Sequence, residues 1–172
     1  MNSERENHMK STLKRQLWTL GLWLTVFLTC TVFGCGSPAA SEPDGFRGIK
    51  WAAGAASVSG IDQIAGEGDL LLYEKKDDLL QMEEVKLERV IYGFYKDRFY
   101  MGMVYFSPDG FERIGQILTR ELGQPAKPDN NASKLLWDGD NVSVLLTLGE
   151  NSDQGRLVYL YKPIQLEVEL KK

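Results

Sequence analysis

Few side chains in this 172-residue sequence could act as a nucleophile, a general base or a ligand for a soft metal ion. The sequence has one histidine, His8, and two cysteines, Cys30 and Cys35, and all three lie within its first 35 residues. Zinc sites are built mainly from histidine and cysteine, a Ser-His-Asp triad needs an imidazole, and a cysteine protease needs a thiolate. We therefore expect no metal site, no cofactor and no catalysis of these kinds after Cys35.

Carboxylates remain as candidate catalytic groups, and they occur as adjacent pairs, Asp77 with Asp78 and Glu83 with Glu84. A glycosidase needs two carboxyl groups that face each other across a cleft. Neighbouring residues in a strand point to opposite faces, so neither pair is suited to that task. The stretch EKKDDLLQMEEVK is interpreted as a solvated loop or strand edge, and the sequence predicts no enzymatic activity.

The stretch WDGDNVS offers oxygen ligands for calcium from Asp138, Asp140 and Asn141. It lacks the twelve-residue ligand spacing and the terminal glutamate of a calcium loop. Asp-Gly between two apolar runs is instead typical of a β-hairpin, so we predict a turn here and no metal.

A different chemistry is indicated at Cys35. Lys10, Lys14 and Arg15 precede an uncharged, mainly apolar run over residues 16–34, which is the layout of a signal peptide. The four residues VFGC that end at Cys35 resemble the lipobox of bacterial membrane lipoproteins, whose cysteine receives a lipid and becomes the mature N-terminus. The run is also just long enough to span a bilayer, so an uncleaved anchor remains an alternative.

The resemblance implies a protein of the bacterial cell envelope, attached to the membrane through its N-terminal lipid. Gly36 stands where an aspartate would retain such a lipoprotein in the inner membrane, so the outer membrane is favoured. We divide the chain into a signal peptide at 1–34, a flexible tether at 35–44 and one globular domain at 45–172. Without the first 34 residues the chain has 16 basic and 22 acidic residues, a net charge of −6, which argues against nucleic acid as a partner.

The pattern of β-branched and aromatic residues predicts strands at 46–51 and 70–75 and a long hairpin at 85–107, with a polar turn among residues 96–98. Between the first two strands the glycine-rich and alanine-rich segment permits at best a short helix at 58–64. After the hairpin, the segment 108–122 has apolar residues at helical spacing, Pro108 in its first turn and Gly123 after its end. It is predicted as one long amphipathic helix.

Three further strands are predicted at 134–137, 141–149 and 156–162. The tail 165–172 alternates with period two and is interpreted as an edge strand or a frayed end. Short loops between strands favour antiparallel neighbours, and a single amphipathic helix must cover one sheet face. The expected fold is α+β, with a mostly antiparallel sheet of about five to seven strands and one long helix in mid-chain.

The segments GFRGIKW, VIYGFYKDRFY and LGQPAKP resemble segments of small uncharacterised envelope proteins of bacteria, over residues 45–162. No established activity comes with this resemblance. The architecture is also loosely similar to small accessory lipoproteins of the outer-membrane β-barrel assembly machinery, although those begin with a helical pair. This second likeness is an analogy of fold only.

Two functions are compatible with these features. The first is a lipid-anchored domain with a non-enzymatic binding, assembly or regulatory role toward another envelope protein. The second is a periplasmic protein that binds a small molecule or a lipid in a pocket lined by Tyr92, Tyr95, Tyr100 and Tyr105. A carboxylate-based hydrolase is a third and weaker alternative, since no motif supports it.

The second strand of the long hairpin is apolar on both of its alternating faces, whereas a strand with one solvated face should alternate apolar with polar residues. We predict that Val104 and Phe106 face the helix, and that Tyr100 shares their face. The more open face then carries Phe99, Met101, Met103 and Tyr105, which form the candidate interaction surface. Burial of that face under the segment 46–51 is the alternative.

Overall fold

The computed structural model describes residues 42–126, 133–149 and 153–171. These residues belong to a compact unit that spans Ala39–Lys172. The predicted signal peptide, Cys35 and most of the predicted tether lie outside the described residues, and so does the loop between the mid-chain helix and the next strand.

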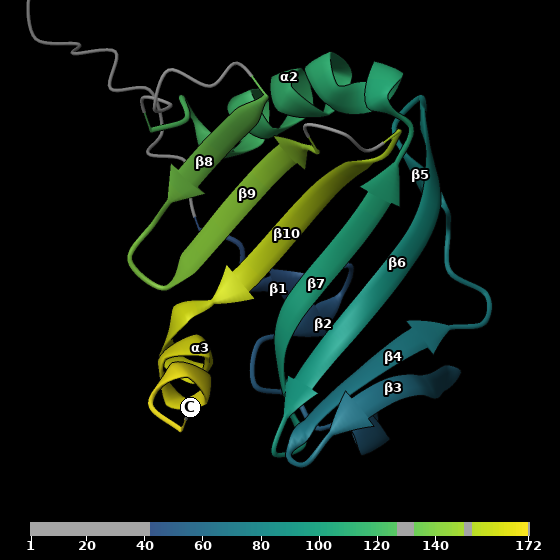
Figure 1. The fold of residues 1–172 in the computed structure, drawn as a ribbon, viewed down its shortest axis with the longest axis vertical. Coiled ribbons are helices and arrows are strands. Elements are labelled where there is room, and N and C mark those ends of the chain that lie inside the picture. The colour runs from purple at the N-terminus through teal and green to yellow at the C-terminus, as the bar shows by residue number, and fades with distance from the viewer. Residues whose placement is uncertain (1–41, 127–132, 150–152, 172) are drawn as a thin grey trace, which may run out of the picture. The chain divides into compact units, whose positions relative to one another are not determined.

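One antiparallel sheet dominates the described part of the chain (Figure 1). Each neighbouring pair of strands along it is antiparallel, as predicted. In spatial order its strands are β3 (Ile61–Glu67), β4 (Leu70–Lys75), β6 (Val85–Tyr95), β7 (Arg98–Phe106), β10 (Gly155–Tyr161), β9 (Val142–Leu148) and β8 (Lys134–Asp138). The short strand β5 (Gln81–Met82) pairs with β6 beside this path and makes an eighth strand, one more than the upper expected number.

The long hairpin at 85–107 is confirmed as β6 and β7. Tyr95 pairs with Arg98, so the turn contains two residues, Lys96 and Asp97. Both have positive φ, 48° and 59°, as in the two-residue turns whose twist matches that of antiparallel strands. The sequence was compatible with a turn of either two or three residues, and the structure has the two-residue turn.

The mid-chain helix is shorter than predicted. A 3-10 turn, η2 (Pro108–Gly110), leads into α2 (Phe111–Leu122), which has twelve residues, or about 18 Å. Its apolar stripe is buried, as predicted, and Gly123 ends the helix with a φ of 84°. The helix is therefore correctly placed, but it is a short element and not a long one.

The C-terminal tail is helical, so its prediction as an edge strand or frayed end was wrong. It forms α3 (Lys162–Glu169), with Pro163 in the first turn. Proline has no N–H to donate to a sheet, whereas the first turn of a helix does not require one. Ile164 and Val168, four residues apart, pack on the sheet, so the period of this segment is helical.

The beginning of the domain also differs from the prediction. The segment 46–51 is a miniature hairpin of β1 (Gly45–Phe46) and β2 (Ile49–Lys50), which turns at Arg47 and Gly48, both with positive φ. The short helix permitted at 58–64 does not form: the 3-10 turn η1 (Ala55–Ser57) ends before this segment, and the edge strand β3 begins within it, at Ile61. Local glycine content therefore marked turns here and not a helix.

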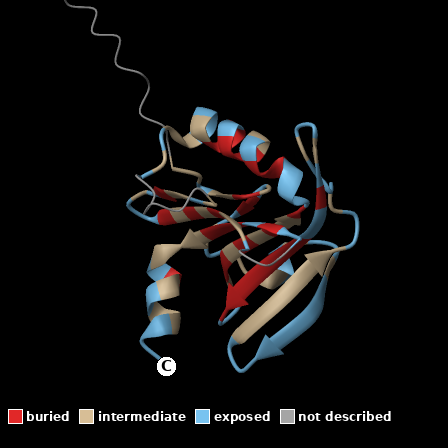
Figure 2. Cartoon of the chain, turned by 45° about the horizontal axis from the view of Figure 1, so that its top comes forward, coloured by how far each residue is buried: buried red, intermediate tan, exposed pale blue. Residues whose placement is uncertain are grey.

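The two faces of the sheet are covered very differently. The main core lies on one face, where α2 and the β1–β2 hairpin pack against the strands (Figures 1 and 2). Gly102 allows the Phe46 ring to lie directly on β7, because a Cβ at this position would be 2.4 Å from a ring atom of Phe46. A second, smaller cluster lies around α3 and contains Ile164, Tyr95 and Tyr100. We call the face opposite α2 the open face.

Candidate interaction face

Strand pairing aligns the side chains of the open face in rows that cross the sheet, because directly paired residues in antiparallel strands point to the same side. The middle row crosses five strands and is apolar throughout. It consists of Leu136, Leu145, Val158, Met103 and Ile91. We call it the apolar row.

The row two residues further along the strands is polar and basic. It consists of Lys134, Thr147, Arg156, Tyr105 and Arg89. We call it the basic row. Arg89 is neutralised by an ion pair with Glu74. Arg156 lies over the Tyr105 ring, 5.8 Å from its centroid, and neither Arg156 nor Lys134 pairs with a carboxylate among the described residues.

On the other side of the apolar row, Leu160 and Met101 belong to the row that α3 partly covers. The helix is held there by the Arg98 guanidinium, which donates to both carboxylate oxygens of Glu167 at 3.0 and 2.6 Å. Lys162 adds an ion pair with Asp138 at 2.7 Å. The apolar row is thus bordered by charge on one side and by a small helix on the other.

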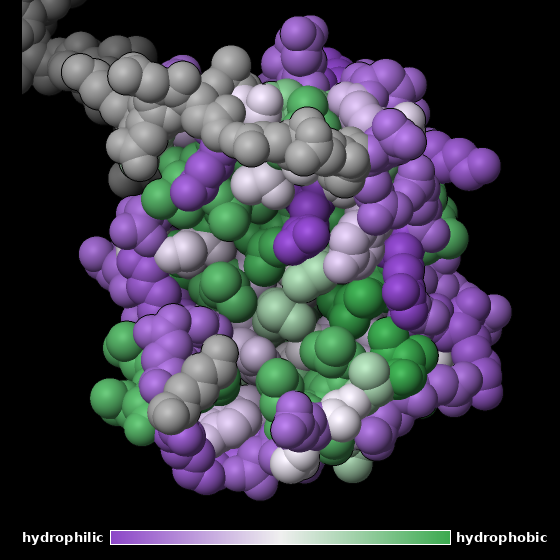
Figure 3. All heavy atoms as spheres, viewed as in Figure 1, coloured by the Kyte–Doolittle hydropathy of each residue, from purple (hydrophilic) through white to green (hydrophobic). Residues whose placement is uncertain are grey.

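Figure 3 shows this side of the molecule. Apolar side chains gather across the middle of the sheet, with polar residues around them. Val158 and Ile91 are buried by their neighbours, while Leu136, Leu145 and Met103 are half-buried. Apolar patches at a protein surface can mark a site for a partner, so the three half-buried side chains make this row a candidate.

The structure places three of the four predicted surface residues on the open face. Met101, Met103 and Tyr105 lie there and are half-buried. Val104 and Phe106 point to the opposite face and pack in the main core with α2, as predicted.

The placement of Phe99 on the open face was wrong. Phe99 is 0% exposed, and its ring stacks on Trp51 at a centroid distance of 5.1 Å. A bulge in β7 is the cause: Met101 pairs with Gly93, but Phe99 pairs with Phe94, so Tyr100 is an extra residue. The bulge reverses the alternation and moves Tyr100 to the open face, where it is buried in the α3 cluster.

The contributions of β8, β9 and β10 to this face were not predicted from the sequence. The sequence did contain an indication, because Leu136, Leu145 and Val158 are apolar at strand positions that would be polar on a solvated face. Nothing local to each strand indicated that these residues align with Met103. That alignment follows from β10 lying between β7 and β9.

The four tyrosines of the predicted ligand pocket do not share a cavity. Tyr92 lies in the main core, Tyr95 and Tyr100 lie in the α3 cluster, and Tyr105 is in the basic row. The Tyr92 hydroxyl donates to Asp78 at 2.6 Å. Burial, with this hydrogen bond to Asp78, raises the pKa of Tyr92 far above its usual range.

Three of the four adjacent acidic residues, Asp78, Glu83 and Glu84, are ion-pair partners. Asp78 accepts hydrogen bonds from Arg47 at 2.9 and 3.2 Å, which join the β1–β2 turn to the segment between β4 and β5. Glu83 and Glu84, in the β5–β6 turn, pair with Arg113 of α2. No group of three acidic, histidine or cysteine side chains that could hold a metal occurs within the described ranges.

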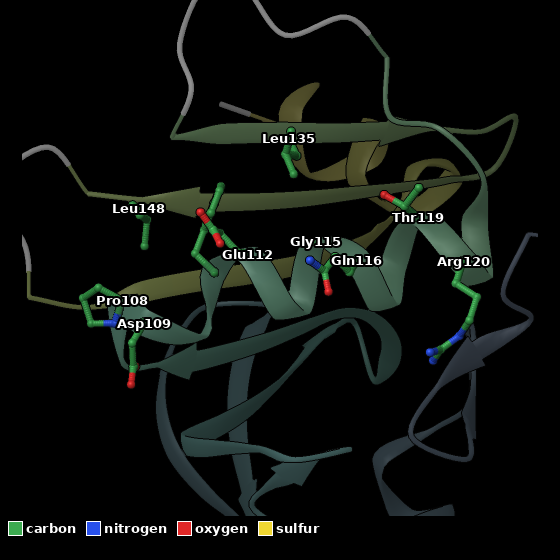
Figure 4. Close-up of a pocket in the computed structure, with 10 residues that line it drawn as sticks. Pro108, Asp109, Glu112, Gly115, Gln116, Thr119, Arg120, Leu135 and Leu148 are labelled. Atoms are coloured by element: carbon green, nitrogen blue, oxygen red, sulfur yellow. The ribbon is translucent and has the colours of Figure 1, made fainter.

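A hollow of about 940 Å³ runs beside α2 (Figure 4). Leu135 and Leu148 form its wall on the sheet, and Glu112, Gln116 and Thr119 line it from the helix. Its volume is in the range of ligand sites. Leu148 stands close to residue 150, where the described chain is interrupted, and we assign no ligand to this hollow.

Among the residues that the structure describes, no helix is long and apolar enough to cross a bilayer. Comparison with known proteins found no matching family model, no similar curated protein and no similar solved structure.

Proposed function

We propose that this chain is a lipid-anchored protein of the bacterial envelope whose domain binds another protein through its open sheet face. The role is non-enzymatic. The observation that carries the proposal is the apolar row, which crosses five paired strands on the face opposite α2. Cys35 is the proposed lipid attachment site, and the outer membrane is the favoured location.

The chemistry of the face indicates the kind of partner. The apolar row favours an apolar contact surface, and Lys134 and Arg156 next to it have no carboxylate partner among the described residues. A partner segment with apolar side chains flanked by aspartate or glutamate would complement both the apolar row and the two basic side chains next to it. Such charge pairs at the edge of an interface add specificity and faster association more than they add affinity.

The anchor position favours a protein over anionic lipid as this partner. Glu42, the first described residue, accepts a hydrogen bond from the backbone N–H of Asn141 in the β8–β9 turn, at 3.0 Å. Lys134 lies at the opposite end of β8. A chain attached to the membrane just before Glu42 therefore enters the domain at the end of the sheet that is distant from the basic row.

The test places a photoreactive amino acid at Leu145, in the apolar row, of the full chain in its native membrane. We expect a protein adduct whose crosslinked peptide combines apolar and acidic residues. The adduct should decrease strongly in the double variant Lys134→Glu, Arg156→Glu, because charge reversal repels an acidic partner.

The matched control is Lys50→Glu, a charge reversal at an exposed residue of β2, outside the open face. It should leave the adduct unchanged, and all variants should unfold at the same temperature as the parent. An adduct with phospholipid, with a second copy of this chain or with a basic peptide would contradict the proposal, as would an adduct insensitive to the double charge reversal.

A further inference from the structure

The C-terminal helix α3 has an apolar edge that faces away from the sheet. Leu166 and Leu170, the residue that caps the C-terminal end of the helix, are 58% and 87% exposed, and they lie four residues apart on one side. Ile164 and Val168 point the other way and pack in the α3 cluster. The helix therefore needs Ile164 and Val168 for folding, but not Leu166 and Leu170.

This edge lies beside the point at which the tether enters the domain. Asn141 connects the two, because its backbone N–H donates to Glu42 at 3.0 Å and its carbonyl oxygen accepts from the backbone N–H of Lys162 at 2.8 Å. Lys162 is the first residue of α3, which is about 12 Å long. Both leucines are therefore within a short distance of the first described residue.

The length of the preceding chain limits how far the domain can move from the membrane. Seven residues connect Cys35 to Glu42, and fully extended they reach about 25 Å. A bilayer that holds Cys35, or the apolar run before it, is thus within reach of Leu166 and Leu170.

We propose that α3 rests on this bilayer and inserts Leu166 and Leu170 into its interface. The inference depends on the proposed membrane attachment and adds a second, noncovalent contact. The charges of α3 nearest the sheet are already paired, Lys162 with Asp138 and Glu167 with Arg98, and Lys171, just after the helix, pairs with Asp69 at 3.0 Å. Two exposed leucines on a short helix beside an anchor are suited to shallow insertion at the headgroup boundary.

The contact also orients the domain. With α3 and the β8–β9 turn at the membrane, the basic row at the other end of the strands is the part of the open face furthest from the lipid. The open face is then presented sideways to a protein in the envelope, and not to the bilayer.

The test uses the full chain in phosphatidylcholine vesicles that contain brominated lipid. An environment-sensitive fluorescent amino acid replaces Glu169, an exposed residue of α3. We expect a blue shift of its emission and quenching by the brominated lipid. The same reporter at Leu79, which is 68% exposed between β4 and β5, should show neither.

A variant pair makes the test specific. With the reporter at Glu169, the double variant Leu166→Ser, Leu170→Ser should lose the quenching. The matched control Leu79→Ser, Leu80→Ser, which also removes two exposed leucines, should retain it. Equal thermal stability of the two variants excludes unfolding as the cause.

Other outcomes identify which proposal fails. Chains that do not float with the vesicles contradict the membrane attachment itself. Chains that float with an unquenched reporter contradict the insertion of α3 alone. A reporter that is shifted but not quenched, with a signal that depends on protein concentration, would assign the leucines to contact with a second copy.

Discussion

Two residues of β7 decide which side chains pack on each face of the sheet. Gly102 brings the Phe46 ring onto the strand and closes one face. Tyr100, the extra residue of the bulge, lies on the other face and supports α3. Neither residue is chemically reactive in this arrangement, and both act by determining which side chains can pack against the sheet.

A methyl group at Gly102 should therefore destabilise the domain. We expect Gly102→Ala to lower the free energy of unfolding by about 1–3 kcal/mol, because the added Cβ would overlap the Phe46 ring. Denaturant unfolding measures this change. In a Phe46→Leu background the same substitution should cost less, since the ring is absent, and an equal cost in both backgrounds would exclude the Phe46 contact as the cause.

At the scale of elements, α3 is attached to the sheet by ion pairs as well as by its apolar contacts. The hydrogen bond from Arg98 lowers the pKa of Glu167 below its ordinary value of 4.5. The hydrogen bonds from Lys162 and, secondarily, Ser143 lower the pKa of Asp138 below 3.8. A carboxyl group with a lowered pKa stabilises the folded state above its ordinary pKa, and this contribution is lost as the pH falls through the folded value.

We therefore expect α3 to loosen below about pH 4 while the sheet stays folded. Hydrogen exchange, corrected for intrinsic rates, should show loss of protection at the Leu170 amide, which donates to Leu166 within α3. The amides shared by β7 and β10 serve as the internal reference. Glu167→Gln should weaken the protection of α3 at neutral pH, and protection that persists to pH 3 would contradict this account.

At the scale of the whole molecule, the proposed N-terminal attachment would determine how the two proposed contacts are used. A domain held close to a membrane meets partners at a high local concentration, so a modest open face is sufficient for binding. This arrangement requires that the membrane attachment last longer than the complex between the open face and its partner.

We expect the mature chain to begin at a lipidated Cys35. Mass spectrometry of the N-terminal peptide from the membrane fraction should find the mass of acyl chains on this residue, and salt washing should not release the protein. An intact peptide that spans Gly34 and Cys35 would show instead that the apolar run remains as an uncleaved anchor. The proposed open-face contact is compatible with either form of attachment.

Helices and strands were predictable from the sequence where the pattern that indicates them lies within the element itself or in the residues next to it. The β6–β7 hairpin followed from two apolar runs around a polar turn, and the position of α2 followed from its apolar spacing and from Gly123. The placement of Val104 and Phe106 in the core also followed from the sequence, because alternation along a strand is local. That no histidine or cysteine follows Cys35 is a property of composition alone.

Only the tertiary structure determined which residues form the proposed interaction face. The bulge at Tyr100 depends on how β7 pairs with β6, and it reversed the position expected for Phe99. The apolar row exists because β10 lies between β7 and β9 and brings Met103 into line with Leu145, which is 42 residues away in the sequence. Pairing between distant strands and the packing of α3 beside them depend on the whole folded chain, so no local pattern could have determined which face stays open.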